Sequence, residues 1–433
     1  MSRVLLIIGG TVVDPATSRH GRFDLLLEDG VLLDIQPSLK AREGARIVDA
    51  DGKLVVPAFV DLHAHFRQPG REDKETIESG ARAAIRGGYG TVCVMPNTTP
   101  PTDHGSAVEW IKDEGRRVGL IEVLPIGALS RGQQGQELTD FGELFESGCV
   151  ALSDDGQPLA DSLLMRRALE YAKLFGRPVM QHAEDPALSA GGVMHEGRTS
   201  TVLGLRGIPG EAETTMVARD LELAQLTGGW LHVSHLSCAR SVELIREAKR
   251  RGVHVTCEVT PHHLALTEEA VAEFDTVAKV NPPLRTEQDR LALIEGLKDG
   301  TIDAIATDHA PHTEWEKDAD FDAAPFGIAG LETALGVCVT ALVEPKRLSW
   351  SQLIEKFSIN PARIVGVDGH GLQKGQPVDL TIIDPSARWV VDPAAFVSKA
   401  KRSPFTGRTL VGQAVSVIRH GQIHSAQDGW ATS

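Results

Sequence analysis

Short apolar runs alternate with segments of helical periodicity from about residue 58 to about residue 345. Each run is apolar at nearly every position, which is typical of a strand buried on both faces, and most are followed by a helix-like segment such as residues 74–88. This alternation predicts parallel strands joined by helices. The eight runs are residues 58–65, 89–97, 121–128, 149–155, 178–184, 230–235, 253–259 and 303–309. We therefore predict an α/β protein with a TIM-like (β/α)8 barrel.

The two ends of the chain carry the pattern of short strands and tight turns instead. The dipeptides Asp29-Gly30, Asp51-Gly52 and His420-Gly421 each separate two strand-like runs, which is a hairpin signal. These segments predict small antiparallel sheets, and we expect both termini to build one small β-sandwich domain. The predicted boundaries are residues 1–57 and 360–433 for the β domain and residues 58–359 for the barrel.

A doubly wound open sheet is the alternative α/β architecture. That fold requires a Gly-rich phosphate-binding turn directly after the first strand. Here the first run leads into His63, Ala64 and His65, and no such turn follows. The barrel is therefore the favoured fold.

Polar side chains stand at the carboxyl ends of six of the eight predicted strands. In chain order they are His63 and His65, Asn97, Asp154 and Asp155, His182, His235, and Asp308. Because barrel active sites are built at that end of the strands, we expect these side chains to meet. His63 and His65 are two residues apart, so both point to one face of their strand and can bind one ion. Imidazole and carboxylate ligands predict a divalent metal site that suits Zn²⁺, Mn²⁺ or Co²⁺, with zinc as the default.

The residues around the predicted metal site suit a hydrolytic reaction. A divalent ion with an open position acidifies a water molecule, and Asp308 can move the proton between that water and a leaving group. Arg67, two positions after His65, can receive a substrate carboxylate as a planar fork. A surface Arg67 paired with Glu72 or Asp73 is the alternative. No Gly-x-Ser-x-Gly elbow and no Walker loop is present, so metal-assisted hydrolysis is the predicted reaction class.

Three further histidines receive structural interpretations. His262 and His263 follow the seventh predicted strand, where we expect hydrogen-bonded structural roles rather than metal ligation. His232 lies at odd spacing from His235 on the sixth strand, so we expect it to point away and to pack between barrel and helices.

Composition narrows the choice of partners and compartment. Lys and Arg total 44 against 59 Asp and Glu, a net charge of −15, which argues against nucleic acid or an anionic membrane as the main partner. The five cysteines never occur in Cys-x-x-Cys spacing, so neither a disulfide framework nor a thiolate zinc site is predicted. No run approaches the roughly 20 apolar residues that span a bilayer, and no secretory signal pattern is found. We therefore expect a cytoplasmic protein.

The motifs, taken in order, resemble those of the dihydroorotases in the cyclic amidohydrolase superfamily. The resemblance begins at residues 61–98, which include DLHAHFRQPG, and continues through SDDG, QHAED, HVSHLSCARSVELI, CEVTPHH, KVNPPLR, ATDHAPH and PFGIAGLET. It covers nearly the whole chain, and SDDG and TDHAPH fit the long-chain bacterial type, class I. The resemblance implies reversible cyclisation of N-carbamoyl-L-aspartate to L-dihydroorotate, the ring-closing step of pyrimidine biosynthesis.

Carried over residue by residue, the resemblance implies one or two Zn²⁺ ions per subunit. Asp308 is then a ligand and also the catalytic proton shuttle, and Asp154 is the rival of Asp155 for the bridging position. The implied ligands are His63, His65 and Asp308 for one ion, His182 and His235 for the other, and Asp155 between them. The implied substrate contacts are His65, Arg67, Asn97, Asn281, His312 and the backbone at Phe326 and Gly327.

Several alternatives and departures accompany the resemblance. Hydantoinases and allantoinases share the fold and the histidines but bridge their metals with a carbamylated lysine on strand four, and residues 148–156 contain no lysine. Some relatives are inactive scaffolds that assemble with aspartate transcarbamoylase, but here every ligand position is filled. Gln68 stands where the family pattern has an acidic residue. We expect a homo-oligomer, and association with aspartate transcarbamoylase and closure of residues 313–328 as a lid are further hypotheses.

Overall fold

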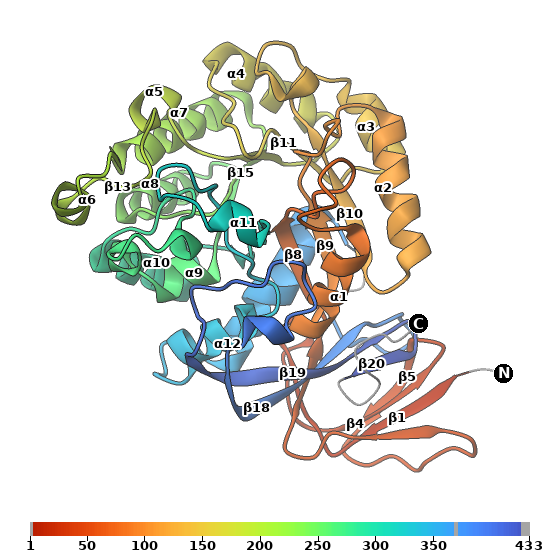
Figure 1. Ribbon diagram of the computed structural model, residues 1–433. Coiled ribbons are helices and arrows are strands. Elements are labelled where there is room, and N and C mark those ends of the chain that lie inside the picture. Colours follow the sequence, from red (N-terminus) through yellow and green to blue (C-terminus); the bar gives the residue numbers. More distant parts are fainter. Residues whose placement is uncertain (1–2, 368–370, 426–433) are drawn as a thin grey trace.

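The computed structural model describes residues 3–367 and 371–425, and its centre is an eight-stranded parallel sheet. The strands follow one another around the sheet in the order of the chain (Figure 1). A bridge between Ala64 and His309 brings the two edges together, so the sheet forms a nearly closed barrel. The barrel strands are β8 (Phe59–Ala64), β9 (Tyr89–Val94), β10 (Glu122–Ala128), β11 (Ala151–Ser153), β12 (Val179–Gln181), β15 (Leu231–Val233), β16 (Val255–Val259) and β17 (Ala304–Ile305). All eight predicted strands are confirmed.

Helices surround the barrel because their apolar faces pack on the outside of the strands (Figure 1). The first of them shows how the sequence sets a helix. Thr76 caps its start by accepting a hydrogen bond from the Ser79 amide, and Gly88 ends it with a φ of 97°. The longer helices are α1 (Ile77–Gly87), α2 (Gly105–Val118), α3 (Phe141–Ser147), α4 (Ser162–Lys173), α7 (Glu211–Thr227), α8 (Ala239–Arg250) and α10 (Glu287–Lys298).

Shorter elements fill the loops between these helices and strands. One of them, α11 (Glu314–Lys317), lies in the loop that follows the last barrel strand. In the described part of the chain, no helix combines the length and the apolar character needed to cross a bilayer. The other short elements are α5 (Pro186–Ser189), β13 (Met194–His195), α6 (Arg198–Leu203), β14 (Gly207–Ile208), α9 (Pro261–Ala265), α12 (Ala334–Cys338), α13 (Trp350–Ile354) and α14 (Asn360–Val365).

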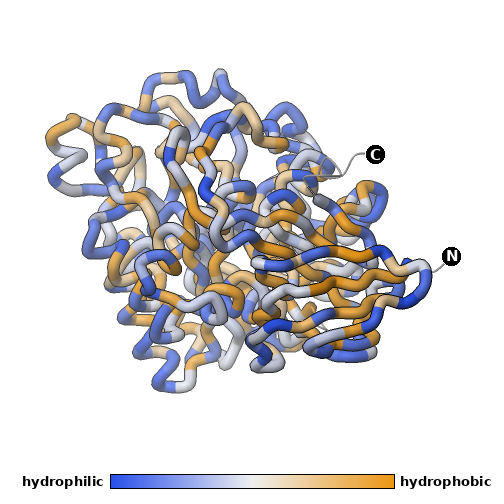
Figure 2. Tube along the Cα trace, turned by 90° about the horizontal axis from the view of Figure 1, so that it is seen from below, coloured by the Kyte–Doolittle hydropathy of each residue, from blue (hydrophilic) through white to orange (hydrophobic). Residues whose placement is uncertain are grey.

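Both ends of the chain build two further sheets, as predicted. One is four-stranded in the order β5-β4-β1-β6, and the other is six-stranded in the order β20-β19-β18-β7-β2-β3. Buried side chains of both sheets, among them Leu27 and Ile418, share one apolar core, and Figure 2 shows long apolar stretches along strands at this end of the molecule. The strands are β1 (Val4–Ile8), β2 (Thr11–Asp14), β3 (Arg19–Arg22), β4 (Asp24–Glu28), β5 (Val31–Gln36), β6 (Arg46–Asp49), β7 (Leu54–Pro57), β18 (Leu380–Val390), β19 (Thr409–Arg419) and β20 (Gln422–Ser425).

The pairing within these sheets corrects the expectation that they are purely antiparallel. The turns at Asp29-Gly30 and His420-Gly421 form hairpins as predicted. The turn at Asp51-Gly52 instead carries the chain from one sheet to the other, because β6 pairs in parallel with β1 and β7 pairs in parallel with β2. A turn signal specifies that the chain reverses locally, and it does not specify which strands then pair.

The exact limits of the two domains stay a prediction. The predicted β domain includes residues 368–370 and 426–433, which lie outside the described residues. Just beyond the predicted limit at residue 359, α14 contributes Ala362 and Ile364 to the core that contains Val60 and Leu62 of β8. The chain therefore stays in contact with the barrel over at least this helix.

Candidate active site

The carboxyl ends of five barrel strands bring six buried side chains together. We call this set the strand-end cluster. His63 lies on β8 and the other members follow their strands within a few residues, so the barrel itself determines where the backbone of each one starts. The members of the strand-end cluster are His63, His65, Asp155, His182, His235 and Asp308.

Asp155 lies at the centre of the strand-end cluster. Its Oδ2 atom is 3.2 Å from His63 Nε2 and 3.4 Å from His65 Nε2. Its Oδ1 atom is 3.5 Å from His182 Nδ1 and 3.3 Å from His235 Nε2. Each of these two groups has its ligand atoms within 4.8 Å of one another, so one carboxylate is shared by two triads of metal-ligand type.

Asp308 stands next to the first triad. Its Oδ1 atom lies 3.1 Å from His65 Nε2 and 3.6 Å from His63 Nε2. Burial by itself would raise the pKa of Asp308, but the hydrogen bond with His65 and the nearby His63 lower it well below its usual range. The Asp308 carboxyl is therefore ionised and can accept a proton.

The arrangement of the ring nitrogens fits a cation. The Nε2 atom of His63 is fully buried and, among the described residues, has no aligned hydrogen-bond partner although carboxylate oxygen is close. His182 Nδ1 and His235 Nε2 lie only 2.9 Å apart, so their lone pairs face nearly the same point. Imidazoles and ionised carboxylates that converge in this way are the donor set of a divalent metal site.

The structure separates the two neighbouring aspartates. Asp154 turns away from the histidines and accepts hydrogen bonds from the backbone amide of Ser130, at 3.0 Å, and from its hydroxyl. Asp155 alone of the pair reaches the ring nitrogens. The geometry therefore favours Asp155 for the bridging position that we predict.

A buried glutamate that sequence reasoning missed orients His63. Glu258 of β16 has Oε1 at 2.9 Å from His63 Nδ1 and Oε2 at 3.2 Å from His232 Nε2. Burial raises the pKa of Glu258, but its contacts with His232 and His63 outweigh this and lower it to about 2. An acceptor on Nδ1 leaves Nε2 of His63 free for a metal, which is the usual arrangement behind metal-binding histidines. The available signal was a charged residue within the otherwise uncharged run VTCEV, residues 255–259.

His232 corrects the expectation that it faces the helices. It contacts Glu258 and Thr256, with 2.9 Å between His232 Nδ1 and Thr256 Oγ1. The alternation rule failed because β15 ends at Val233, so the spacing to His235 does not follow strand geometry. The two adjacent histidines of α9, His262 and His263, differ from each other. His263 forms hydrogen bonds with Thr260 and with the carbonyl of Pro282, as expected, whereas His262 Nε2 has no partner among the described residues.

The strand-end cluster opens into a pocket of about 340 Å³. Every side chain predicted to contact the substrate lies on its wall, together with five members of the strand-end cluster. These lining residues are His65, Arg67, Asn97, Asp155, Gly156, His182, His235, Asn281, Asp308, Ala310, His312, Pro325, Phe326 and Gly327. The structure therefore brings the predicted residues to one place, and their individual roles stay predictions.

Arg67 faces the pocket rather than the surface. Its Nε atom donates to the carbonyl of Pro311 at 3.4 Å, and within the described ranges no acceptor engages its two terminal nitrogens. Burial lowers the pKa of Arg67 to about 10 although the carboxylates of Asp308 and Asp155 oppose this, so the group stays charged at neutral pH. The alternative pairing with Glu72 or Asp73 is not observed, because Asp73 pairs with Arg71 instead.

His312 is held by two protein groups. Its Nε2 atom donates to the carbonyl of Phe326 at 2.8 Å, and its Nδ1 atom accepts from the ammonium of Lys74 at 3.1 Å. Burial, followed by the charges of Arg67 and Lys74, lowers the pKa of His312 to about 2, so the ring is neutral. A substrate oxygen would have to take the place of the Phe326 carbonyl to bond Nε2.

Two amide side chains touch the strand-end cluster. Asn97 Oδ1 accepts from His65 Nδ1 at 2.9 Å, which directs His65 Nε2 towards the carboxylates and leaves the Asn97 NH₂ group on the pocket side. Asn281 Nδ2 lies 3.4 Å from His182 Nε2, and its Oδ1 atom is buried without a partner among the described residues. Gln68 is a separate case, because its Oε1 atom accepts from the Ile77 amide at the start of α1.

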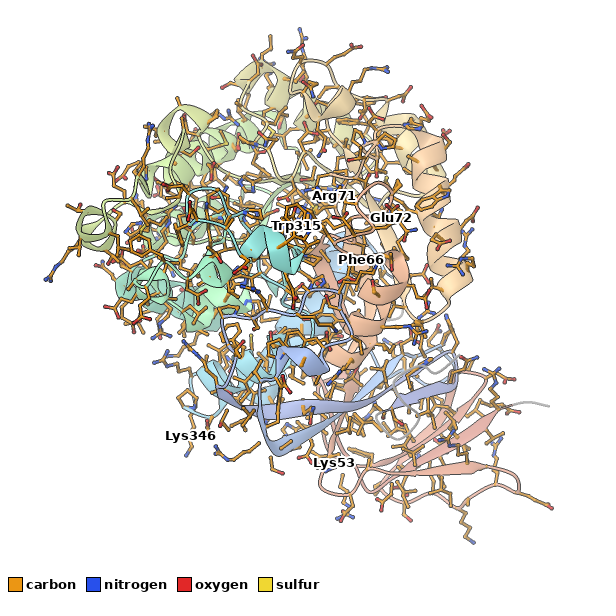
Figure 3. The ribbon with its side chains drawn as sticks, viewed as in Figure 1. Lys53, Phe66, Arg71, Glu72, Trp315 and Lys346 are labelled. Atoms are coloured by element: carbon orange, nitrogen blue, oxygen red, sulfur yellow. The ribbon has the colours of Figure 1, made fainter. Side chains whose placement is uncertain are left out.

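The loop after β17 is attached to the loop after β8. Glu316 of α11 pairs with Arg71 at 3.1 Å and with Lys74 at 2.8 Å, and Figure 3 shows Trp315 of α11 and Arg71 in this region. The loop that we predict as a possible lid is therefore held to the loop after β8 in this structure. Its closing and opening stay a hypothesis.

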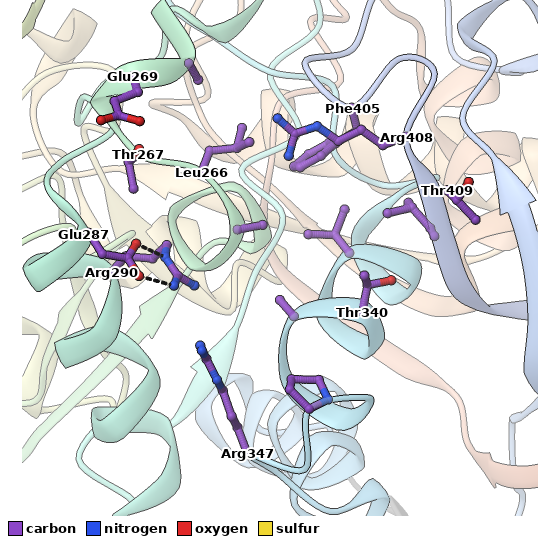
Figure 4. A pocket seen from close by; sticks show the side chains of 16 residues that line it. Leu266, Thr267, Glu269, Glu287, Arg290, Thr340, Arg347, Phe405, Arg408 and Thr409 are labelled. Atoms are coloured by element: carbon purple, nitrogen blue, oxygen red, sulfur yellow. Dashed lines mark hydrogen bonds and ion pairs between the residues drawn. The ribbon is translucent and has the colours of Figure 1, made fainter.

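A larger cavity of about 650 Å³ lies elsewhere, between α9, α10, α12 and β19. Its wall carries Arg290, Arg347 and Arg408, and Arg290 is bonded to Glu287 (Figure 4). No histidine, cysteine or aspartate is among the described residues that line it. The smaller pocket is therefore the one with the chemistry of an active site.

Known proteins resemble this chain along nearly its whole length. Residues 52–241 match the family model described as Dihydro-orotase-like. A dihydroorotase from Pelotomaculum thermopropionicum is 52% identical over 419 residues, which is 97% of this chain and 98% of that protein. A dihydroorotase from Anaeromyxobacter dehalogenans is 50% identical over 430 residues, or 99% of each chain. Among solved structures, an L-hydantoinase (dihydropyrimidinase) from Arthrobacter aurescens has a TM-score of 0.87 at 25% identity, covering 98% of this chain and 96% of that one.

Proposed function

Because the chain belongs to the dihydroorotase family, we propose that it interconverts N-carbamoyl-L-aspartate and L-dihydroorotate in pyrimidine biosynthesis. The family assignment makes the protein an enzyme with a barrel fold and a candidate metal site. The observation that carries the proposal is the pair of triads that share Asp155, together with a pocket whose wall holds both Asp155 and Arg67. Hydrolysis and cyclisation are then the two directions of one reaction.

Zinc is the ion that we propose for the strand-end cluster. His63 and His65 would hold one ion with Asp308, and His182 and His235 a second, with Asp155 between them. Imidazole nitrogen and carboxylate oxygen support this choice. A divalent ion, when bound, polarises an amide carbonyl and acidifies a water molecule.

Asp308 is the residue that we propose to move the proton. It is ionised, buried and on the pocket wall, so it can accept a proton from the attacking water and hand it to the leaving ring nitrogen in the hydrolytic direction. In the cyclisation direction the same carboxyl takes the proton from the carbamoyl nitrogen. Its contact with His65 Nε2 orients the carboxyl towards the centre of the strand-end cluster.

Binding of the substrate carboxylate is the role that we propose for Arg67, Asn97 and His312. Among the described residues, no acceptor engages the terminal nitrogens of Arg67 or the NH₂ group of Asn97, so both can donate to a carboxylate. His312 joins them if its Nε2 proton leaves the Phe326 carbonyl. Asn281 and the backbone at Phe326 and Gly327 would contact the ring.

The test is a comparison of cyclic substrates on the purified, zinc-loaded protein. We expect hydrolysis of L-dihydroorotate, cyclisation of carbamoyl aspartate at mildly acidic pH, and far lower kcat/KM on hydantoin, dihydrouracil and allantoin. These uncharged rings lack the carboxylate, so they leave the polar groups on the Arg67 side of the pocket without a partner. When all such groups stay unpaired, a mismatch of this kind lowers kcat/KM by about 10⁴-fold or more. Comparable rates on the uncharged rings would refute the substrate and favour a hydantoinase-like enzyme.

Partners beyond the substrate stay predictions. A cytoplasmic location, a homo-oligomeric state, association with aspartate transcarbamoylase and the absence of nucleic-acid or membrane partners rest on the sequence alone. The scaffold alternative, in which the protein assembles without catalysing, is checked by the same assay. No turnover of any ring by metal-loaded protein would support it.

A further inference from the structure

Two buried lysines stand behind the outer wall of the pocket. Lys279 is 2% exposed and Lys317 is 5% exposed. In the described part of the chain, every hydrogen bond of their ammonium groups goes to a backbone carbonyl. Lysines are rarely this buried without a carboxylate partner, so their position calls for an explanation.

Each ammonium group reaches from its own loop into the other. Lys279 Nζ donates to the carbonyls of Phe321 at 2.6 Å and Asp322 at 3.1 Å. Lys317 Nζ donates to the carbonyls of Thr276 at 3.0 Å and Lys279 at 3.2 Å. The hydroxyl of Thr276 returns a hydrogen bond to the Lys317 carbonyl. The two loops, residues 276–281 and residues 313–328, are therefore tied in both directions, and we call them the lysine-tied loops.

The ties end at groups that form the pocket. Lys279 is two residues before Asn281, and its carbonyl also accepts from the amide of Gly327 at 3.0 Å. Lys279 Nζ lies 4.7 Å from the centre of the Phe326 ring, and Lys317 Nζ donates to the Pro325 carbonyl at 2.9 Å. A displacement of either ammonium group would therefore shift the part of the wall that residues 325–327 provide.

We propose that Lys279 and Lys317 are positioning residues that hold Asn281, Phe326 and Gly327 at the distance from the strand-end cluster that substrate binding needs. The identity of the substrate rests on the proposed function, whereas the tie between the loops does not. A lysine nitrogen can donate three hydrogen bonds. Four of the five bonds cross between the loops and the fifth holds the Pro325 carbonyl, so together they can fix two loops that contain no strand. Neither lysine touches the substrate in this proposal.

The experiment compares Lys317→Met and Lys279→Met with Lys356→Met. Lys356 is a matched control, because it is also buried and bonds a backbone carbonyl, that of Ile302, away from the pocket. The measurements are kcat and KM for L-dihydroorotate, metal content, and hydrogen–deuterium exchange of residues 313–328. In the first two variants we expect unchanged metal content, a KM about 10-fold to 100-fold higher with a smaller change in kcat, and faster exchange of this loop.

The control and a milder change keep the result decisive. Lys356→Met should leave both KM and exchange of residues 313–328 as in the unmodified protein. Lys317→Arg keeps a cationic donor, so its KM should lie close to that of the unmodified protein. It replaces Lys317→Met if that variant does not fold. Unchanged KM and exchange in the lysine variants, or loss of metal from them, would overturn the proposal. Faster loop exchange without any dihydroorotate turnover in the unmodified protein would reject the proposed function and leave the tie intact.

Discussion

The strand-end cluster and the lysine-tied loops face the same pocket, but their polar groups are held by different means. In the cluster, each functional side chain starts on a barrel strand or shortly after one, and the side chains contact one another, as Asp155 does with four ring nitrogens. In the loops, the functional groups sit on irregular backbone, and two ammonium groups hold that backbone through its carbonyls. One side is placed by the sheet and the other by a few side chains.

The two sides also carry opposite charge. The strand-end cluster contains two ionised carboxylates, Asp155 and Asp308. Against the effect of burial, contacts with them raise the pKa of His63, and Asp155 raises that of His182, so this side favours positive charge and attracts a cation. The opposite side contributes Arg67 and Lys74, whose positive charges, in addition to burial, lower the pKa of His312, so it attracts an anion. A substrate with a carboxylate at one end and a hydrolysable amide at the other is matched by this division. Changes on the cluster side should therefore affect metal and turnover, and changes on the other side should affect binding.

The largest effect should come from removing the shared ligand. Asp155→Ala should abolish most metal binding and activity, because both triads lose their common carboxylate. Asp154→Ala is the matched control. It should keep its metal while it loses about 1–3 kcal/mol of stability, since the Ser130 amide becomes unpaired. Elemental analysis and unfolding curves check both. Equal metal content in the two variants would contradict the central place of Asp155.

Asp308→Asn should come next. We expect kcat to fall by about 10²–10⁴-fold, because an amide cannot accept the proton, with a smaller change in KM. Steady-state kinetics in both reaction directions measure this, and metal content shows whether the side chain is also needed as a ligand. A variant that keeps its kcat would place the proton transfer on another group.

Glu258→Gln tests whether the cluster depends on groups behind it. The amide can still accept from His63 Nδ1 but carries no charge, so we expect metal affinity to fall by about 10-fold to 100-fold. Competition with a chelator gives the affinity. His20→Ala, at an exposed position on β3, serves as a control for general effects of surface change. An unchanged affinity would make Glu258 a purely structural residue.

Arg67→Lys should have the smallest effect of these substitutions. Its effect should be confined to substrate binding. A point charge does not replace the planar fork, so we expect KM for L-dihydroorotate to rise about 10-fold while metal content stays the same. Kinetics over a range of substrate concentrations separate KM from kcat. If metal content falls while KM rises, the division between the two sides is wrong.

The barrel and most residue types of the site were within reach of the sequence. Buried parallel strands are apolar runs, and their carboxyl ends meet at one face, so His63, His65, His182, His235 and Asp308 could be assigned to one site from position along the chain. The two hairpins at Asp29-Gly30 and His420-Gly421 could also be predicted, because a short local turn signal specifies each of them. In each case the information lies within a few consecutive residues.

Tertiary structure alone decided what depends on partners that are distant in the chain. Whether β6 pairs with β1 or β7, whether Asp154 or Asp155 meets the histidines, and that Glu258 stands behind His63 all follow from contacts across the fold. Lys279 and Lys317 read as ordinary loop lysines in the sequence, because a backbone carbonyl acceptor leaves no trace in the residue type that provides it. Periodicity records which face of an element is buried, and only the packed chain brings a donor and its acceptor within 3 Å.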